Sequence, residues 1–146
     1  MKEIIEQIKN NNLSYEIKDE KIFIYNIGNN NIIEVMKETD LSDKDLFLDY
    51  IVSFATQHWH LDDIEDVLEC IKDIINDQIL PIEFYYKGEP RFGESISREQ
   101  FDNLSLSFLI DQYGFSEDYI SNYEYEVHSW SGKYDIKKQP ITNLQK

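Results

Sequence analysis

Residues that could hold a metal ion gather in one short stretch, His58-Trp59-His60-Leu61-Asp62-Asp63. On a regular strand, His58 and His60 lie on the same face, because side chains alternate between the two faces. Two imidazoles on one face can bind one divalent metal. The competing interpretation is structural: histidines packed on aromatic neighbours where a strand ends, then an aspartate that caps a helix. We favour the structural interpretation, which predicts no metal site and no cofactor.

The same stretch resembles the H-x-H-x-D-H signature of the metallo-β-lactamase-fold hydrolases. In that family, two histidines and an aspartate-histidine pair hold a dinuclear metal site. Asp63 stands where the family has its last histidine, and the chain has one further histidine, His128, whereas the family needs more ligands downstream. The resemblance implies an alternative function, a small metal-dependent hydrolase built on His58, His60 and Asp63.

Arrangements for nucleophilic or phosphate chemistry are absent from the sequence. The turn Ser129-Trp130-Ser131-Gly132 lacks the first glycine of the G-x-S-x-G motif. The phosphate-binding pattern G-x-x-x-x-G-K does not occur. Carboxylate pairs are frequent, but in a chain with 29 acidic residues their proximity in sequence means little. The sequence therefore predicts no catalytic residue and a protein that is not an enzyme.

An amphipathic helix is predicted over residues 62–77. Its apolar residues recur with the period of a helix: Ile64, Val67, Leu68, Ile71, Ile74 and Ile75. Asp62 is the predicted N-cap, with Glu65 three residues later in the spacing of a capping box. The acidic side chains fall away from the apolar stripe: Asp63, Asp66, Glu69, Asp73 and Asp77. They form either a solvated face or a docking surface for a basic partner.

Aromatic residues cluster near the C-terminus, where 119–129 and 133–137 are predicted strands of an edge hairpin. Tyr123, Tyr125 and Trp130 belong to this cluster. Aromatic side chains on such a hairpin either pack against cross-strand neighbours or anchor a protein partner. As partner-binding residues, we predict these three aromatics and the five acids of the helix.

The remaining pattern predicts one α+β domain, 1–146, with a mainly antiparallel sheet and the 62–77 helix packed on one face. Residues 2–10 form a helix, and strands are expected at 13–17, 21–27, 79–86 and 91–96. Segment 32–37 is ambiguous: its isoleucines and valine favour a strand, but it is short. Residues 38–45 form an acidic loop, and the apolar run 47–61 reads as one central strand. A helix is expected at 98–113, ended by Gly114. The tail from about Gln139 is expected to be loose.

Composition limits the possible partners. The net charge of −15 argues against binding to nucleic acid or to an anionic membrane. Cys70 is the single cysteine, which excludes an internal disulfide and predicts a buried thiol. No apolar stretch has the length of a signal peptide or a membrane span, so a soluble cytoplasmic protein is expected.

In overall character the chain resembles the small acidic immunity proteins of bacterial toxin systems. The stretches that carry this resemblance are DDIEDVLECIKDIIND at 62–77 and EYEVHSWSGKYD at 124–135. The resemblance implies a protein that binds and blocks a basic partner such as a toxin or nuclease. Alternatives are a nucleic-acid-mimicking inhibitor, the metal-dependent hydrolase, and a regulatory or structural domain. The partner's identity and the oligomeric state are not predicted.

Overall fold

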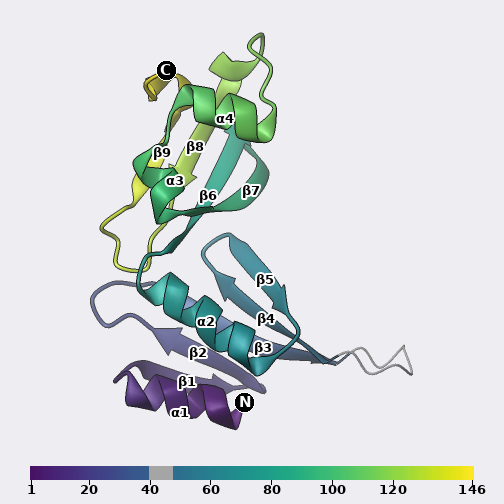
Figure 1. Cartoon of the computed structure of the whole chain (residues 1–146), viewed down its shortest axis with the longest axis vertical. Helices are drawn as coiled ribbons and strands as arrows, with labels where there is room; N and C mark the ends of the chain where they lie inside the picture. Colours follow the sequence, from purple (N-terminus) through teal and green to yellow (C-terminus); the bar gives the residue numbers. More distant parts are fainter. Residues whose placement is uncertain (40–47) are drawn as a thin grey trace. The chain divides into compact units, whose positions relative to one another are not determined.

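All strand pairs are antiparallel, and the strands form two separate sheets. The computed structural model describes residues 1–39 and 48–146 (Figure 1). The chain divides into two compact units, Met1–Asn76 and Asp77–Lys146, here called the N-terminal and C-terminal units. The predicted α+β class with a mainly antiparallel sheet is confirmed. The sequence predicts no boundary at residue 76, and the assignment of one domain stays a prediction.

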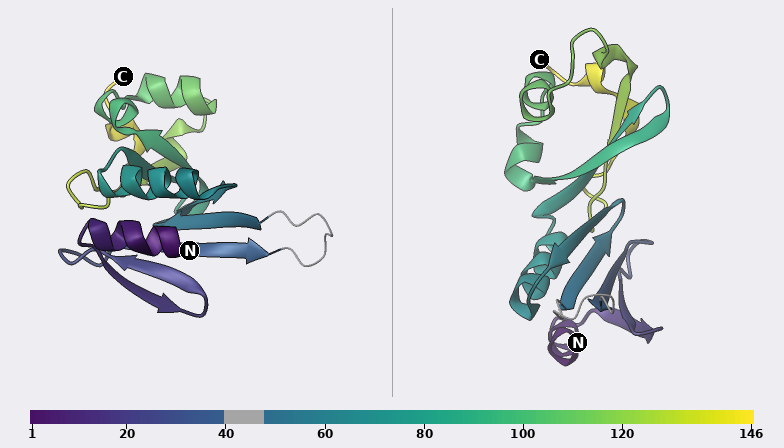
Figure 2. Two further views of the ribbon diagram at one scale, coloured as in Figure 1. Left: turned by 60° about the horizontal axis from the view of Figure 1, so that its bottom comes forward. Right: turned by 90° about the vertical axis from the view of Figure 1, so that its right-hand side faces the viewer.

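The N-terminal unit is a five-stranded meander with two helices on one face. Its strands follow one another in space in chain order: β1 (Ser14–Lys18), β2 (Lys21–Tyr25), β3 (Ile32–Thr39), β4 (Leu48–Phe54) and β5 (Gln57–Leu61). Helices α1 (Lys2–Asn10) and α2 (Ile64–Ile75) lie side by side on this sheet (Figure 2). Alternate residues such as Ile24, Val35 and Val52 are fully buried, as the two-residue period of a one-sided sheet requires.

The prediction of one long strand over 47–61 is wrong, because the chain reverses at Ala55 and Thr56. Phe54 pairs with Gln57, and Val52 pairs with Trp59, so β4 and β5 form a tight hairpin. Ala55 occupies the left-handed region, with φ of 54°. Glycine or asparagine usually marks such a turn, and neither is present here. Most of the loop predicted at 38–45 lies outside the described residues.

The C-terminal unit contains a four-stranded sheet in the order β7-β6-β8-β9. Its elements in chain order are β6 (Ile79–Tyr86), β7 (Glu89–Ser97), α3 (Arg98–Asp102), α4 (Leu106–Tyr113), η1 (Ile120–Asn122), β8 (Tyr123–Val127), β9 (Ile136–Pro140) and η2 (Ile141–Asn143). The core includes Leu80, Ile82 and Phe84 of β6, all fully buried, with Leu109 of α4. Tyr125 and Val127 of β8 belong to the same core, so the two central strands carry much of it.

The helix predicted at 98–113 is broken into two. Ser97 and Gln100 form the predicted capping box of α3. The side chain of Ser105 then accepts a hydrogen bond from the Phe108 amide at 3.0 Å and starts α4. A serine that caps a new helix competes with continuation of the previous one. Gly114, with φ of 70°, ends α4 as predicted.

The C-terminal tail differs from the predicted loose segment. Gln139 pairs with Tyr125, and Pro140 pairs with Glu124, so both belong to β9. Ile141 follows them and is fully buried in the core of the C-terminal unit. Burial of this side chain holds the tail against the sheet.

Candidate functional site

The acidic side of α2 begins at its N-cap. The Asp63 carboxylate accepts a hydrogen bond from the Asp66 amide at 2.9 Å, so Asp63 is the N-cap, and the assignment of Asp62 is wrong. Asp63, Asp66 and Glu69 are exposed, together with Glu65. These four residues are the acidic face of α2.

Two further acids of the predicted partner-binding set, Asp73 on α2 and Asp77, are less exposed. Asp73 is half-buried. Asp77 lies beyond the end of α2, is only 8% exposed, and accepts a hydrogen bond from the Ser131 amide at 3.1 Å. The Asp77 carboxylate therefore stabilises a loop of the C-terminal unit and is not part of an exposed acidic surface.

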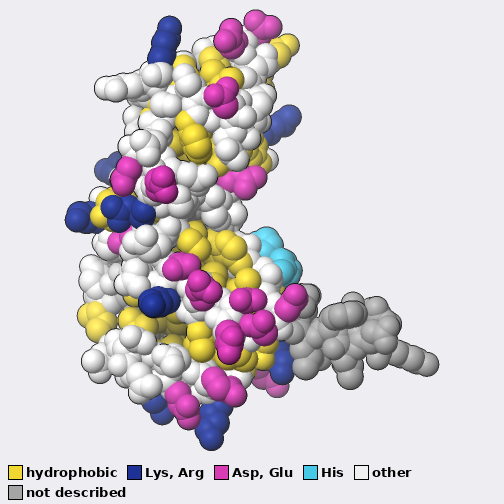
Figure 3. All heavy atoms as spheres, viewed as in Figure 1, with side chains coloured by type: hydrophobic (Ala, Val, Ile, Leu, Met, Phe, Trp, Pro, Cys, Tyr) yellow, Lys and Arg dark blue, Asp and Glu magenta, His cyan; other side chains and the backbone are white. Residues whose placement is uncertain are grey.

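A groove of about 600 Å³, lined by aliphatic side chains with polar ones among them, runs between α1 and α2. The residues that line it come from both helices and their ends: Ile4, Gln7, Ile8, Asn11, Leu13, Leu68, Glu69, Ile71, Lys72, Ile75 and Asn76. Figure 3 shows acidic side chains along α2 with hydrophobic side chains beside them. Glu69 belongs both to the groove and to the acidic face of α2, so the two surfaces are continuous.

The acidic face of α2 makes no ion pair among the described residues, although Lys72 lies on the same helix and lines the groove with Glu69. The ion pairs found in the described part of the chain have Glu3, Glu34 and Glu126 as their acids, and none includes an acid of α2. Carboxylates without intramolecular ion pairs are available to a basic partner.

Two of the three aromatic residues predicted to anchor a partner are buried. Tyr125 is 2% exposed and Trp130 is 6% exposed, so neither can serve as an accessible anchor. The hairpin was expected at the edge of a sheet, whereas β8 is an inner strand between β6 and β9. Tyr123 remains half-buried, with its ring 5.0 Å from that of Tyr86 and 4.7 Å from that of Phe115.

The two histidines of the metal motif lie together. His58 and His60 are exposed on edge strand β5, and their ring centroids are 5.2 Å apart. Asp63 is occupied at the start of α2 by its hydrogen bond to the Asp66 amide. Within residues 1–39 and 48–146, no three His, Cys, Asp or Glu residues are grouped so that they could hold a metal ion.

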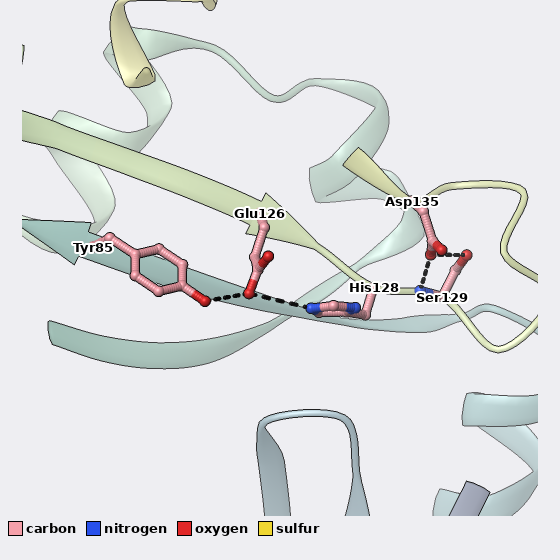
Figure 4. A network of polar contacts seen from close by, with 5 residues as sticks. All are labelled: Tyr85, Glu126, His128, Ser129 and Asp135. Atoms are coloured by element: carbon pink, nitrogen blue, oxygen red, sulfur yellow. Dashed lines mark hydrogen bonds and ion pairs between the residues drawn. The ribbon is translucent and has the colours of Figure 1, made fainter. Parts of the chain in front are cut away.

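The C-terminal sheet carries a polar network that no sequence motif predicted. The Tyr85 hydroxyl donates a hydrogen bond to Glu126 Oε1, and His128 Nε2 lies 3.4 Å from the same oxygen (Figure 4). Burial raises the pKa of Tyr85, and the hydrogen bond to Glu126 and the charges of Glu126 and Glu83 raise it further. These effects keep the Tyr85 hydroxyl protonated, so the network binds β6 to β8.

Ser129 and Cys70 are poorly placed for nucleophilic chemistry. The buried Ser129 hydroxyl donates to Asp135 at 2.9 Å, an acceptor that also binds the Ser129 amide at 2.7 Å. Burial, with a smaller effect of the Asp73 charge, raises the pKa of Cys70 to about 12. A thiol with this pKa is protonated at neutral pH and reacts slowly.

No protein-family model, no curated protein and no solved structure matches this chain. Among the described helices, none is both long and apolar enough to cross a membrane.

Proposed function

We propose that this protein is an acidic protein-binding module, an inhibitor of the immunity-protein type, that binds and blocks a basic partner such as a toxin. The observation that carries the proposal is the continuity of the α1–α2 groove with the acidic face of α2. The net charge of −15 favours a basic partner over nucleic acid.

The partner segment that fits this surface is amphipathic and basic. Apolar side chains of the segment would enter the groove and contact Leu68 and Ile75, which are half-buried in the free protein. Its Lys and Arg residues would lie against Glu65, Asp66 and Glu69. A helix that lays its apolar face into a hydrophobic groove is a common mode of peptide recognition.

The two parts of this surface act on different steps of binding. Carboxylates that attract a basic partner raise the association rate, and salt screens that attraction. Apolar contact in the groove slows dissociation, the step that sets most affinity differences among related complexes. In this proposal the groove provides the apolar contacts that the sequence analysis expected from Tyr125 and Trp130.

The first experiment recovers the tagged protein from its native cells and identifies co-purifying proteins by mass spectrometry. The proposal expects one basic protein in near-stoichiometric amount. Clean bait without such a companion would count against a stable inhibitory complex.

With that partner in hand, binding kinetics test the acidic face of α2. The variant Glu65→Lys/Asp66→Lys/Glu69→Lys should associate more slowly and with a flatter salt dependence. The control variant Asp111→Lys/Glu117→Lys/Asp118→Lys makes the same change in charge at exposed acids of the C-terminal unit. Equal loss of rate in both variants would show that only net charge matters.

The groove needs a separate variant. Leu68→Gln places a polar amide in the groove and should speed dissociation several-fold, with little change in the association rate. Circular dichroism and the urea midpoint check that the variant is folded. An unchanged dissociation rate in the folded variant would exclude the groove as the binding surface.

A further inference from the structure

A hollow of about 370 Å³ opens at one end of the C-terminal sheet. Three segments that are distant in sequence meet there: the β6–β7 hairpin, the connection between α4 and η1, and the start of β8. The side chains that matter most are Tyr86, Arg91, Phe92, Phe115, Tyr119 and Tyr123. The hollow lies near the lower end of the size range of small-molecule pockets.

Aromatic ring contacts form the walls of the hollow. The Phe92 and Phe115 ring centroids are 5.8 Å apart with their planes at 29°, and the Phe115 ring lies 4.7 Å from that of Tyr123. Phe115 is only 7% exposed, whereas Tyr119 is 56% exposed. The hollow therefore combines fixed rings with one accessible ring, and a planar apolar group can stack there.

The backbone holds these segments together without a ligand. The Lys87 amide donates to the Asn122 carbonyl at 2.9 Å and joins the β6–β7 turn to η1. Lys87 and Gly88 have φ of 50° and 83°, the left-handed values of a tight hairpin turn. A pre-formed site needs little ordering when a ligand binds.

Arg91 gives the hollow its charge preference. The residue is exposed, and its guanidinium carbon lies 5.9 Å from the centre of the Tyr86 ring. Within the described part of the chain, no carboxylate lies within 4 Å of this guanidinium, although the protein has 29 acidic and 14 basic residues. A guanidinium without an ion-pair partner at the edge of an aromatic hollow can bind a carboxylate by donating two parallel hydrogen bonds to it.

We propose that this hollow binds a small aromatic carboxylate, with its ring against the aromatic walls and its carboxylate on Arg91. A cationic ligand fits less well on the Tyr86 side, because Arg91 and the Lys87 ammonium, 5.5 Å from the Tyr86 ring, provide positive charge there. The negative charge of Glu94 acts on the other side, at Tyr113. A polyanion fits less well because the whole chain carries a charge of −15. One negative charge and one ring match the site.

Titration of the full chain with four matched probes tests the proposal by amide NMR. The probes are 3-phenylpropionate, the neutral 3-phenylpropionamide, the cationic 3-phenylpropylamine and the non-aromatic hexanoate. The expected order of affinity puts 3-phenylpropionate first, at a roughly millimolar dissociation constant for so small a ligand. Shifts should concentrate at the amides of Phe92, Gly114 and Ser116, which line the hollow.

Two variants separate the charge from the stacking. Arg91→Gln should weaken 3-phenylpropionate binding by about fivefold or more and leave the amide probe unchanged. Lys133→Gln removes the same charge from a residue outside the hollow and should change neither probe. Tyr119→Leu should weaken the binding of both 3-phenylpropionate and 3-phenylpropionamide. The dispersion of the amide spectrum shows whether each variant is folded.

Several results would overturn the proposal. They are equal or tighter binding of the amine, hexanoate binding as tight as that of 3-phenylpropionate, absence of shifts with all four probes, and an unchanged affinity in folded Arg91→Gln.

Discussion

The Tyr85 hydroxyl donates a hydrogen bond to the Glu126 carboxylate, which joins the two inner strands of the C-terminal sheet. Burial raises the pKa of Tyr85 above its ordinary value of 10, and the contact with Glu126 adds to the rise. The protonated phenol is thus favoured in the folded state. The stabilisation that the protonated Tyr85 gives the folded state is fully present below pH 10, the ordinary pKa of tyrosine in the unfolded chain. It is lost as the pH rises toward the raised pKa of Tyr85 in the folded protein.

We predict that Glu126→Gln lowers the pKa of Tyr85, because an amide replaces the charged acceptor. The measurement is a pH titration of the tyrosine ring resonances by NMR, with Tyr85→Phe used to assign the signal among ten tyrosines. Glu124→Gln is the control, since Glu124 pairs with Tyr85 in register but does not accept its hydrogen bond. Equal effects of the two substitutions would contradict a specific role for Glu126.

The start of α2 yields a second prediction. Asp63→Ala should lower the free energy of unfolding by about 1 kcal/mol, the usual cost of a lost N-cap. Asp62→Ala removes the neighbouring exposed acid, which makes no capping hydrogen bond, and should have a much smaller effect. Urea unfolding of both variants gives the comparison. A larger loss for Asp62→Ala would reverse the assignment of the cap.

The β4–β5 turn yields a third prediction. Ala55→Gly should raise the free energy of unfolding by about 0.5–1 kcal/mol, because Ala55 has φ of 54° and glycine adopts this conformation without steric cost. Thr56→Gly is the matched control, since Thr56 is not in the left-handed region and glycine there only adds freedom to the unfolded chain. Stabilisation by both substitutions would argue against relief of strain at Ala55.

Cys70 yields a fourth prediction. Its pKa of about 12, raised first by burial and then by Asp73, means that the folded thiol at pH 8 is almost entirely protonated. Alkylation with iodoacetamide should therefore be far slower in the native protein than in urea. Mass spectrometry of timed samples measures both rates. Comparable rates would show that Cys70 is accessible and ionised in the native state.

The sequence predicted well the elements that depend on local pattern. The apolar stripe from Ile64 to Ile75 has the helical period, and α2 covers that range. Two adjacent acids, Asp62 and Asp63, precede it, and pattern alone could not choose the cap between them. At Ala55 the turn forms in a residue that carries none of the usual turn markers, so the hairpin was predicted as one strand.

Features that depend on strand order lay beyond the sequence. Tyr125 and Trp130 are of residue types that often anchor a protein partner, but both side chains are buried. Tyr125 lies on β8, which pairs with a strand on each side. The contact between Tyr85 and Glu126 joins residues 41 apart and exists only because β6 pairs with β8. The sequence pattern placed Asp77 among the acids of the helix, whereas in the structure its carboxylate accepts a hydrogen bond from the Ser131 amide.

The different strand orders of the two sheets have a consequence for how the protein folds as it is synthesised. Every strand pair of β1 to β5 joins neighbours in the chain, so hairpins of the N-terminal unit can form one after another as they emerge from the ribosome. In the C-terminal unit, β6 pairs with β8, for example Ile82 with Val127. This pairing can form only after β8 has been synthesised. We expect pulsed hydrogen exchange during refolding to show protection of β2 amides before those of β8. The last-formed strand pairs would then be those that carry the Tyr85–Glu126 contact and the walls of the aromatic hollow.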